Sequence, residues 1–410
     1  MRDGRPTTQA RNLISVLRTA DQYGLRAEDY CTDHGIALCA EQSPAVLEAD
    51  FDHALTNAAL RFFQHVHFGR VDPRRAGFDL NFERTALHFD ELLAAAAATP
   101  DIQGVIASVE PPFQHYQLLK KSLARYRLLA SGQITPTKAE LRTAPYEKRI
   151  RQIELTLERW RWLPAFNSPP IIVNIPQFRL FAFNSTADRK AEILQMDVIV
   201  GRTYPKLRTP VFAADLRYVI FRPYWDVPYS ITQREMLRDI QAKPDFLRRQ
   251  HLQLVDGAGD RAPVVPASPQ NLRALAEGKL RLRQQPGEDN ALGLIKFMLP
   301  NPYNVYLHST PASRLFSRSQ RTFSHGCIRV SDPVSLAEHV LRSATGGWTK
   351  ESIVAAMHGA DNVRVNLKTP IRVLILYATA LATEDGAVMF FPDIYGHDRK
   401  LETLLGLSPI

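Results

Sequence analysis

The pattern of apolar residues changes near position 170, and this change limits the fold to a helical part followed by a part rich in strands. Before position 131, apolar side chains recur at steps of three and four, as in residues 51–66 and 113–130, which is the spacing of amphipathic helices. After position 170, short β-type runs end at turn residues. These runs span residues 170–176, 180–183, 196–201, 218–221, 305–308 and 373–377. The sequence therefore predicts an α+β protein with an all-helical N-terminal domain and a mostly β, sandwich-like second domain.

The length of 410 residues suits two or three domains. A stretch of linker composition begins at Ser131, and the strand-rich part is interrupted by helical and loop texture. A further helix is expected from Pro333 to Leu341, because proline is favoured in the first turn of a helix. We divide the chain into a helical scaffold domain with its linker, residues 1–150, a strand-rich domain, residues 151–400, with a capping insertion at about 231–290, and a tail, residues 401–410.

Composition excludes several classes of protein. Lys and Arg outnumber Asp and Glu by 51 to 42, a net charge of +9, but the positive residues are dispersed and no nucleic-acid-binding motif is present, so we expect no nucleic-acid partner. No apolar run approaches the roughly 18 residues of a membrane-spanning helix. Near the N-terminus, Arg18 ends the short apolar run 13–17, which is below the roughly 7–15 apolar residues of a signal peptide.

One short segment, residues 324–330, combines the residue types of cysteine chemistry. Cys327 follows Gly326, with His325 two residues before it and Arg329 two residues after it. Nearby positive charge lowers the pKa of a thiol and favours the nucleophilic thiolate. Glycine allows a substrate carbonyl to approach main-chain N–H groups, which would then act as an oxyanion hole. The segment therefore indicates a nucleophilic cysteine.

A nucleophilic cysteine needs a base within reach, and two histidines compete for this role. His325 is near in sequence, but residues two apart in an extended segment lie about 6–7 Å from one another. His308 ends a predicted strand and would come alongside Cys327 if two strands pair. Two other interpretations stay open: Cys327 as a buried core residue, and a zinc site with His308, His325 and Cys327 as ligands, although the paired spacing of structural zinc sites is missing.

The combined motifs resemble the L,D-transpeptidases, the family with the YkuD-like catalytic domain, and in particular the large YcbB-type subfamily. His308, followed after fifteen residues by residues 324–329, is similar to the active-site signature of that family. The resemblance covers about residues 12–400 and is weakest in the N-terminal helices. Its other motifs are residues 158–164, 173–176, 209–210, 223–228, 283–287, 290–293, 296–297, 300–301 and 305–308.

The resemblance implies a role for each matching residue. Cys327 would be the nucleophile, His308 the general base, and Ser309 the residue whose carbonyl orients His308. The oxyanion pocket would be formed by His325, Gly326 and Cys327. The residues implied in substrate binding are Arg329, for a carboxylate, Ser324, Tyr306 and Trp225. For the two aromatic residues, a plain core position is an open alternative. The resemblance implies no metal and no organic cofactor.

The implied activity is peptidoglycan cross-linking. A cysteine thioester would form with release of D-alanine from a tetrapeptide stem, and the amine of a diamino acid would accept the acyl group to give a 3-3 cross-link. The same site would also serve an L,D-carboxypeptidase, an enzyme of D-amino-acid exchange, or one that anchors lipoproteins. A non-catalytic wall-binding protein is the alternative from another class. Carbapenems are expected to acylate Cys327, and the protein is expected to be a monomer.

The chain departs from the subfamily in two respects. Only about twenty residues lie between Ala130 and Arg151, too few for the peptidoglycan-binding domain that the subfamily carries there. Ser309 stands where an acidic residue or glycine often follows the base. Cross-linking takes place outside the inner membrane, so we expect a periplasmic protein in a mature or trimmed form. In that compartment Cys31 and Cys39 would form a disulfide, with two free buried thiols as the alternative.

Overall fold

The computed structural model describes residues 5–40, 47–80, 82, 87–98, 101–185, 193–342 and 344–408. The chain divides into two compact units, Met1–Phe166 with Tyr377–Ile410 (unit 1), and Asn167–Leu376 (unit 2). These units differ from the domains expected at 1–150 and 151–400. The chain returns to the helical unit after residue 376, so the last 34 residues belong to unit 1.

Unit 1 is helical, as the sequence predicts. The predicted helices at 51–66 and 113–130 are confirmed as α2 and α6. Its helices are α1 (Thr8–Arg18), α2 (Glu48–Phe68), α3 (Pro73–Ala76), α4 (Phe89–Ala98), α5 (Ile102–Val109), α6 (Gln114–Ala130), α7 (Lys138–Leu141), α8 (Tyr146–Trp160) and α15 (His397–Leu404). Two short hairpins complete it, β1 (Thr32–Asp33) with β2 (Ile36–Ala37), and β16 (Ala380–Ala382) with β17 (Val388–Phe390). In the described parts of the chain, no helix combines the length and apolar character needed to cross a membrane.

The C-terminal hairpin explains why the chain returns to unit 1. Ala380 and Ala382 of β16 are buried in a cluster with Leu119 and Leu123 of α6 and Ile153 of α8. Apolar burial of this kind is worth about 25 cal/mol per Å². The hairpin therefore completes the core between α6 and α8, a contact between segments more than 200 residues apart that no local pattern encodes.

A buried ion pair anchors α8. The Arg161 guanidinium and the Glu158 carboxylate are both buried and lie 3.2 Å apart. Glu158 Oε1 also accepts hydrogen bonds from the backbone N–H groups of Arg70 and Val71, at 2.5 and 2.9 Å. Tyr116 accepts a further hydrogen bond from Arg161, at 3.2 Å. Motif 158–164, which carries part of the family resemblance, therefore has a structural role here.

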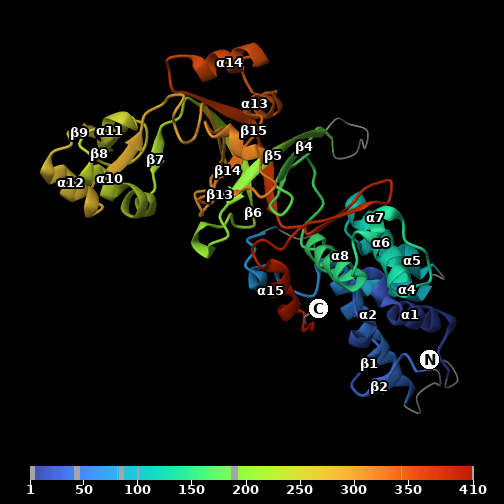
Figure 1. Cartoon of the computed structure of the whole chain (residues 1–410). Coiled ribbons are helices and arrows are strands. Elements are labelled where there is room, and N and C mark those ends of the chain that lie inside the picture. The colour runs from blue at the N-terminus through green and yellow to red at the C-terminus, as the bar shows by residue number, and fades with distance from the viewer. Residues whose placement is uncertain are drawn as a thin grey trace. The chain divides into compact units, whose positions relative to one another are not determined.

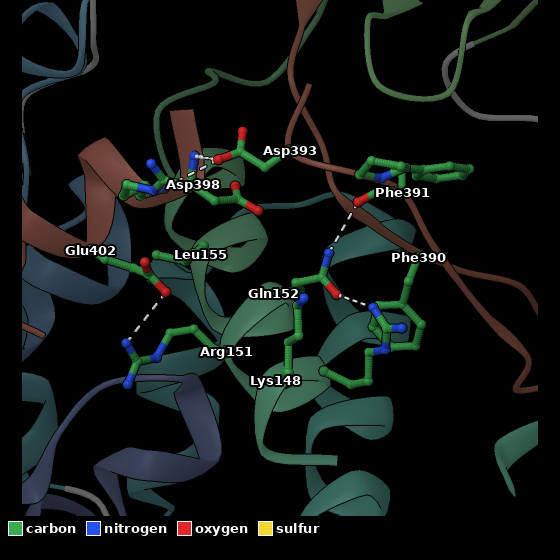
Figure 2. A pocket seen from close by; sticks show the side chains of 12 residues that line it. Lys148, Arg151, Gln152, Leu155, Phe390, Phe391, Asp393, Asp398 and Glu402 are labelled. Atoms are coloured by element: carbon green, nitrogen blue, oxygen red, sulfur yellow. Dashed lines mark hydrogen bonds and ion pairs between the residues drawn. The ribbon is translucent and has the colours of Figure 1, made fainter. Parts of the chain in front are cut away.

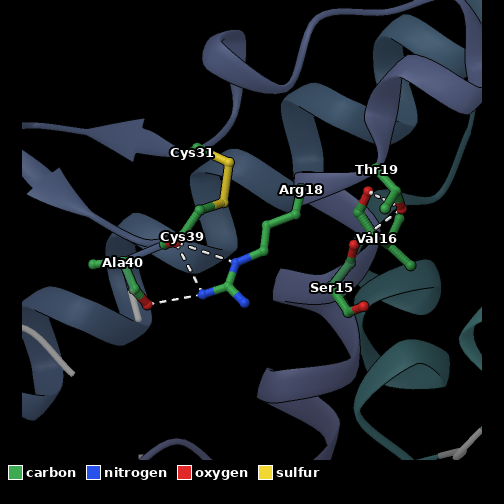
Figure 3. Close-up of a disulfide and its surroundings, with 7 residues drawn as sticks. All are labelled: Ser15, Val16, Arg18, Thr19, Cys31, Cys39 and Ala40. Atoms are coloured by element: carbon green, nitrogen blue, oxygen red, sulfur yellow. Dashed lines mark hydrogen bonds between the residues drawn. A yellow bond between two sulfur atoms is a disulfide. The ribbon is translucent and has the colours of Figure 1, made fainter. Parts of the chain in front are cut away.

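A disulfide joins Cys31 to Cys39, which decides between the disulfide and the two free thiols that the sequence left open. The Arg18 guanidinium donates to the carbonyl oxygens of Cys39 and Ala40, at 2.9 and 2.8 Å, and ties the disulfide-closed loop to the end of α1 (Figure 3). Cys327 is the free cysteine of the chain.

Unit 1 also contains a pocket of about 500 Å³, lined by α8 and the C-terminal segment. Gln152 donates to the carbonyl oxygen of Phe391 at 3.1 Å, and Arg151 lies 3.5 Å from Glu402 (Figure 2). The polar groups drawn in this pocket are thus largely engaged with one another, and they hold α8 against the C-terminal segment.

Unit 2 is built around a closed barrel of eight strands. Around the barrel the order is β5–β14–β12–β11–β6–β15–β3–β4, and β4 pairs back with β5. The strands are β3 (Ile171–Asn174), β4 (Arg179–Phe183), β5 (Ile193–Gly201), β6 (Phe212–Phe221), β11 (Ile295–Met298), β12 (Leu307–His308), β14 (Ile328–Val330) and β15 (Val363–Leu376). Two pairs are parallel, β12 with β14 and β3 with β15, and the others are antiparallel. Strand β13 (Thr322–Ser324) adds to β5 outside this ring.

The predicted sandwich is therefore wrong. The first five residues of β5, 193–197, pair with β4, and the next two, Val198 and Ile199, pair with β14. Because one long strand pairs on both sides, the two sides of the sheet meet and the barrel closes. Short alternating runs separated by turns fit a sandwich and a barrel equally well, so the strand pattern alone could not decide between them.

The predicted insertion forms a cap with its own small core. Its strands are β7 (Trp225–Val227), β8 (Leu252–Val255), β9 (Val264–Val265) and β10 (Arg281–Gln284), in the order β7–β10–β8–β9. Its helices are α9 (Tyr229–Ile231), the π-helix η4 (Thr232–Met236), α10 (Leu237–Ala242), α11 (Phe246–Arg249) and α12 (Pro269–Ala276) (Figure 1). The sequence predicted helix and loop here and missed this sheet. The other helices of unit 2 are α13 (Pro333–Leu341), where the sequence predicts it, and α14 (Lys350–His358).

We expect Glu158→Ala to lower the free energy of unfolding by about 3–5 kcal/mol, because it leaves the buried Arg161 charge without a partner. Glu28→Ala is the matched control, since Glu28 belongs to an exposed ion pair with Arg26 and such pairs contribute about 0–1 kcal/mol. Urea unfolding followed by tryptophan fluorescence measures both. Equally small losses of unfolding free energy in Glu158→Ala and Glu28→Ala would contradict the anchoring role of Glu158.

Candidate active site

Three adjacent strands of the barrel set the geometry of the site. Residues directly opposite one another across β11, β12 and β14 point to the same face of the sheet. One row across these strands faces the core and is apolar: Phe297, Leu307 and Ile328. The next row lies on the outer face and is polar: Lys296, His308 and Arg329. Because side chains alternate between the two faces along each strand, Lys296 and Arg329 lie on either side of His308.

The parallel register of β12 and β14 brings Tyr306, rather than His308, beside Cys327. In this register Leu307 lies opposite Ile328, and His308 lies opposite Arg329. One residue earlier on both strands, Tyr306 therefore lies opposite Cys327. The hydroxyl and the backbone N–H of Tyr306 act as donors toward the Cys327 sulfur in the sense that both lower the pKa of the thiol. The Cys327 thiol lies 3.6 Å from the carbonyl oxygen of Asn304. Within the described residues, the hydrogen-bond partners of this sulfur do not include His308.

Opposing effects act on the Cys327 thiol. Burial raises its pKa, and the Tyr306 hydrogen bonds and the positive charges of Lys296 and Arg329 lower it. The side chain is half-buried. Burial has the largest effect, so the pKa of the thiol is raised, and the hydrogen-bond donors and the two cations offset only part of the cost of forming a thiolate.

His308 is buried, with 3% of its surface exposed. Its Nδ1 donates a hydrogen bond to the carbonyl oxygen of Ser309 at 2.5 Å, which leaves Nε2 as the unprotonated nitrogen. Burial, followed by the charge of Arg329, lowers the pKa of His308 to about 3. The imidazole is thus neutral at physiological pH and able to accept a proton.

A tight turn holds Ser309 in place. Asn290, buried to 1% exposure, accepts from the Leu292 N–H at 2.8 Å and donates to the Gln285 carbonyl at 2.8 Å. Gly293 follows with φ +62°, and a Cβ there would stand 2.6 Å from Ser309 Oγ. Only glycine fits this approach. Motif 290–293 therefore supports the carbonyl group that orients His308.

The loop before Cys327 is held by hydrogen bonds of its own. Ser324 Oγ donates to the Cys327 carbonyl at 2.5 Å and accepts from the Gly326 N–H at 3.1 Å. Buried Thr209 donates to the Gly326 carbonyl at 2.8 Å. Gly326 has φ +118°, a conformation that favours glycine. Ser324, which the sequence placed among the substrate-binding residues, is thus buried and occupied within the loop.

These bonds change the expected oxyanion pocket. The Gly326 N–H is directed at Ser324 Oγ, whereas no acceptor for the Cys327 N–H is found in the part of the chain that the structure describes. Among the described residues the His325 N–H also has no acceptor, so the N–H groups of His325 and Cys327, rather than that of Gly326, are the main-chain donors left for a developing oxyanion. Sequence reasoning grouped the N–H groups of His325, Gly326 and Cys327 and could not distinguish between them.

His325 contacts the cap. Its Nε2 lies 2.6 Å from Glu235 Oε1 of the π-helix η4. The side chain is therefore directed toward the cap, and no group of three or more His, Cys, Asp or Glu side chains in the described ranges is placed to hold a metal ion. His308, His325 and Cys327 do not converge as the zinc alternative requires.

Two further residues complete the placement of the predicted site. Trp225 packs against the hydrophobic core of the cap, which is the core position left open for it in the sequence. Arg329 is placed on the outer row, and its buried Nε has no hydrogen-bond partner among the residues described. Burial lowers the pKa of this guanidinium, and the Cys327 sulfur counteracts that effect.

Lys296 is the residue that sequence reasoning missed. It lies within motif 296–297, for which the resemblance implies no role. Its Nζ lies 3.9 Å from the ring centroid of Tyr306. The position of this lysine in the sequence could have indicated a role in the site. A lysine between the buried Ile295 and Phe297 of a strand must point away from the core.

His308 is expected to stay neutral from pH 8 down to about pH 4.5. Because its pKa is lower in the folded than in the unfolded chain, the unfolded state binds more protons between about pH 3 and 6.5, and stability falls as pH falls through this window. Nitrogen chemical shifts of the imidazole, assigned with the His308→Gln variant, measure this directly. A titration midpoint near 6.5 would contradict the burial of this side chain.

Gly293→Ala should weaken the site without removing any of its polar side chains. The new Cβ would clash with Ser309 and adopt an unfavourable φ, displacing the carbonyl that orients His308. We expect at least a tenfold lower rate in any reaction that uses His308 as its base, since the loss of one orienting contact costs about 1–3 kcal/mol. Gly287→Ala is the control, because a Cβ at Gly287 meets open space. Equal rates for the two variants would refute the supporting role of Gly293.

Comparisons with known proteins agree with this arrangement. Residues 169–373, half of the chain, match the YkuD family, described as the L,D-transpeptidase catalytic domain. Residues 1–123 match a family described as the Scaffold domain. A Haemophilus influenzae protein named "Putative L,D-transpeptidase" is 32% identical over 256 residues, which are 62% of this chain and 50% of that protein. The chain thus spans about half the length of this curated relative. It belongs to the L,D-transpeptidase family, with a YkuD catalytic domain that contains the barrel site.

Proposed function

We propose that this protein is a periplasmic, cysteine-dependent L,D-transpeptidase that forms 3-3 cross-links in peptidoglycan. The observation that carries the proposal is the environment of Cys327. It is the free cysteine of the chain, and its sulfur lies against Tyr306 on the barrel face that also bears a neutral histidine and two cations.

The first half of the reaction transfers the donor acyl group to the enzyme. The Cys327 sulfur attacks the carbonyl carbon of the third residue of a tetrapeptide stem, so that a C–S bond forms and the C–N bond to D-alanine breaks. The Cys327 N–H donates to the oxyanion. The proton lost by the thiol ends on the leaving nitrogen and is carried by His308 Nε2, which is unprotonated in the structure.

The second half transfers the acyl group to an amine. The acceptor amine of a diamino acid attacks the thioester carbonyl and gives up a proton to His308 Nε2. The new C–N bond forms, the C–S bond breaks, and the sulfur recovers the proton. Splitting one acyl transfer into two steps is the gain of covalent catalysis.

Arg329 is suited to bind a carboxylate of the stem peptide. Its Nε has no hydrogen-bond partner among the described residues, and a planar guanidinium matches a carboxylate with two parallel hydrogen bonds. The same nucleophile accounts for carbapenems as expected acylating agents of Cys327. The Cys31–Cys39 disulfide supports an oxidising compartment such as the periplasm.

Product analysis tests this proposal. With a disaccharide-tetrapeptide, the wild-type protein should release D-alanine and form a dimer with a 3-3 linkage, and Cys327→Ala should do neither. His308→Gln should lose at least a hundredfold in rate, in line with general acid–base contributions of about 10²–10⁴. His358→Gln is the matched control, because His358 is an exposed side chain paired with Glu288.

The outcomes separate the alternatives. Release of D-alanine without a dimer would indicate water, a free D-amino acid or a lipoprotein lysine as acceptor. Equal turnover by wild type and Cys327→Ala would reject cysteine chemistry altogether, and no reaction by folded, reduced wild type would favour a wall-binding role.

A further inference from the structure

Lys296 is a half-buried ammonium group without an acidic neighbour in contact. In the described residues it has no carboxylate within ion-pair distance, and its Nζ rests over the ring of Tyr306 at 3.9 Å. Burial lowers its pKa. Partial burial of a cation costs free energy unless a negative group lies near. The charge of Lys296 therefore needs a negative group in its surroundings.

The Cys327 sulfur is the strongest negative influence on Lys296. As a thiolate it raises the pKa of the lysine more than Asp226 or Asp260 of the cap. Asp226 Oδ2 accepts a hydrogen bond from the Gly259 N–H at 3.1 Å, whereas its buried Oδ1 has no hydrogen-bond partner among the described residues. The two carboxylates therefore help to keep the lysine charged, and the sulfur is the group whose charge the lysine balances.

Tyr306 connects the lysine to the sulfur. Lys296 Nζ lies over one face of its ring, the register of β12 with β14 places it opposite Cys327, and its hydroxyl and backbone N–H lower the pKa of the thiol. Burial and the sulfur raise the pKa of the phenol well above its usual value, so the hydroxyl keeps its proton. A cation over the ring draws electron density from the phenol, which makes the hydroxyl a stronger donor to the sulfur.

The other charged groups near Cys327 cannot take the place of Lys296. His308 is buried and neutral before the reaction begins, so no imidazolium balances the sulfur at that stage. Arg329 is the second cation, is subject to repulsion from Arg202, and has its charge neutralised when it binds a substrate carboxylate. Lys296 alone keeps its positive charge available to the sulfur throughout the reaction.

We propose that Lys296 is a positioning residue that stabilises the Cys327 thiolate as it forms, by holding a positive charge over the ring of Tyr306, which the strand register places beside the cysteine. This inference deepens the proposed function and rests on it only in treating Cys327 as the nucleophile. It concerns the positive charge beside the sulfur, whereas the proton transfers of the proposed reaction stay with His308 Nε2.

The pH dependence of alkylation by iodoacetamide tests the inference. The other two cysteines form a disulfide, so the reaction reports Cys327 alone. We expect Lys296→Met to shift the profile upward by about one pH unit, which means about tenfold slower alkylation at pH 7, since one pKa unit is a factor of ten in thiolate. Lys296→Arg should restore the wild-type profile. Above the thiol pKa all variants should react equally fast, which structural damage would not allow.

Lys279→Met is the matched control, because Lys279 is an exposed lysine of unit 2, paired with Glu277, and its profile should match wild type. Superimposed profiles for Lys296→Met and wild type would overturn the inference. If Lys296→Met does not fold, Lys296→Gln and Lys296→Arg decide the question: an upward shift in glutamine alone supports the role of charge, and equal profiles refute it.

Turnover of the tetrapeptide donor separates this inference from the proposed function. A shifted alkylation profile with no release of D-alanine by wild type would leave the lysine role standing and reject the function. Unshifted alkylation profiles with normal wild-type turnover would reject the lysine role and leave the proposed function standing. If both hold, Lys296→Met should recover turnover as pH rises, because the thiolate then forms without the lysine.

Discussion

The parallel pairing of β12 with β14 is the constraint on which the site depends. His308 lies opposite Arg329, and every second residue on these two strands points outward. Tyr306 and Cys327, each two residues earlier, therefore lie opposite one another on the same outward face. A shift of one residue in this register would turn the histidine and arginine into the core and expose Leu307 and Ile328. Burial of the apolar row therefore fixes the polar row, and the same free energy that closes the barrel aligns the reacting groups.

The site concentrates positive charge around a sulfur and a neutral histidine. Burial lowers the pKa of His308 and raises that of Cys327, so both groups favour their uncharged forms. The positive charges of Lys296 and Arg329 act in opposite senses on these two groups. They hinder protonation of His308 and favour ionisation of the Cys327 thiol. In the proposed reaction the neutral histidine would be available as a base, and cations would stabilise the negative charge that develops on the sulfur.

The sequence predicted much of this site and little of its arrangement. Cys327 and His308 stand out by residue type and spacing, and the helices at α2, α6 and α13 follow from periodicity and from Pro333. The barrel could not be predicted, because its closure depends on β5 pairing with two strands at once. The neighbour of Cys327 depends on register, so Tyr306 was assigned to the pocket lining, and Lys296 received no role. The return of residues 377–408 to the helical unit depends on packing between segments far apart in the chain.

The central claim, that the barrel presents Cys327 as the acyl acceptor, is tested most directly by mapping a trapped acyl-enzyme. The wild-type protein is mixed with a tetrapeptide donor in the absence of an acceptor, quenched in acid and digested with trypsin. Cleavage after Arg321 and Arg329 releases the peptide 322–329. We expect the mass of the donor acyl group on this peptide, at Cys327. A folded, reduced protein that releases D-alanine while this peptide stays unmodified would contradict the account.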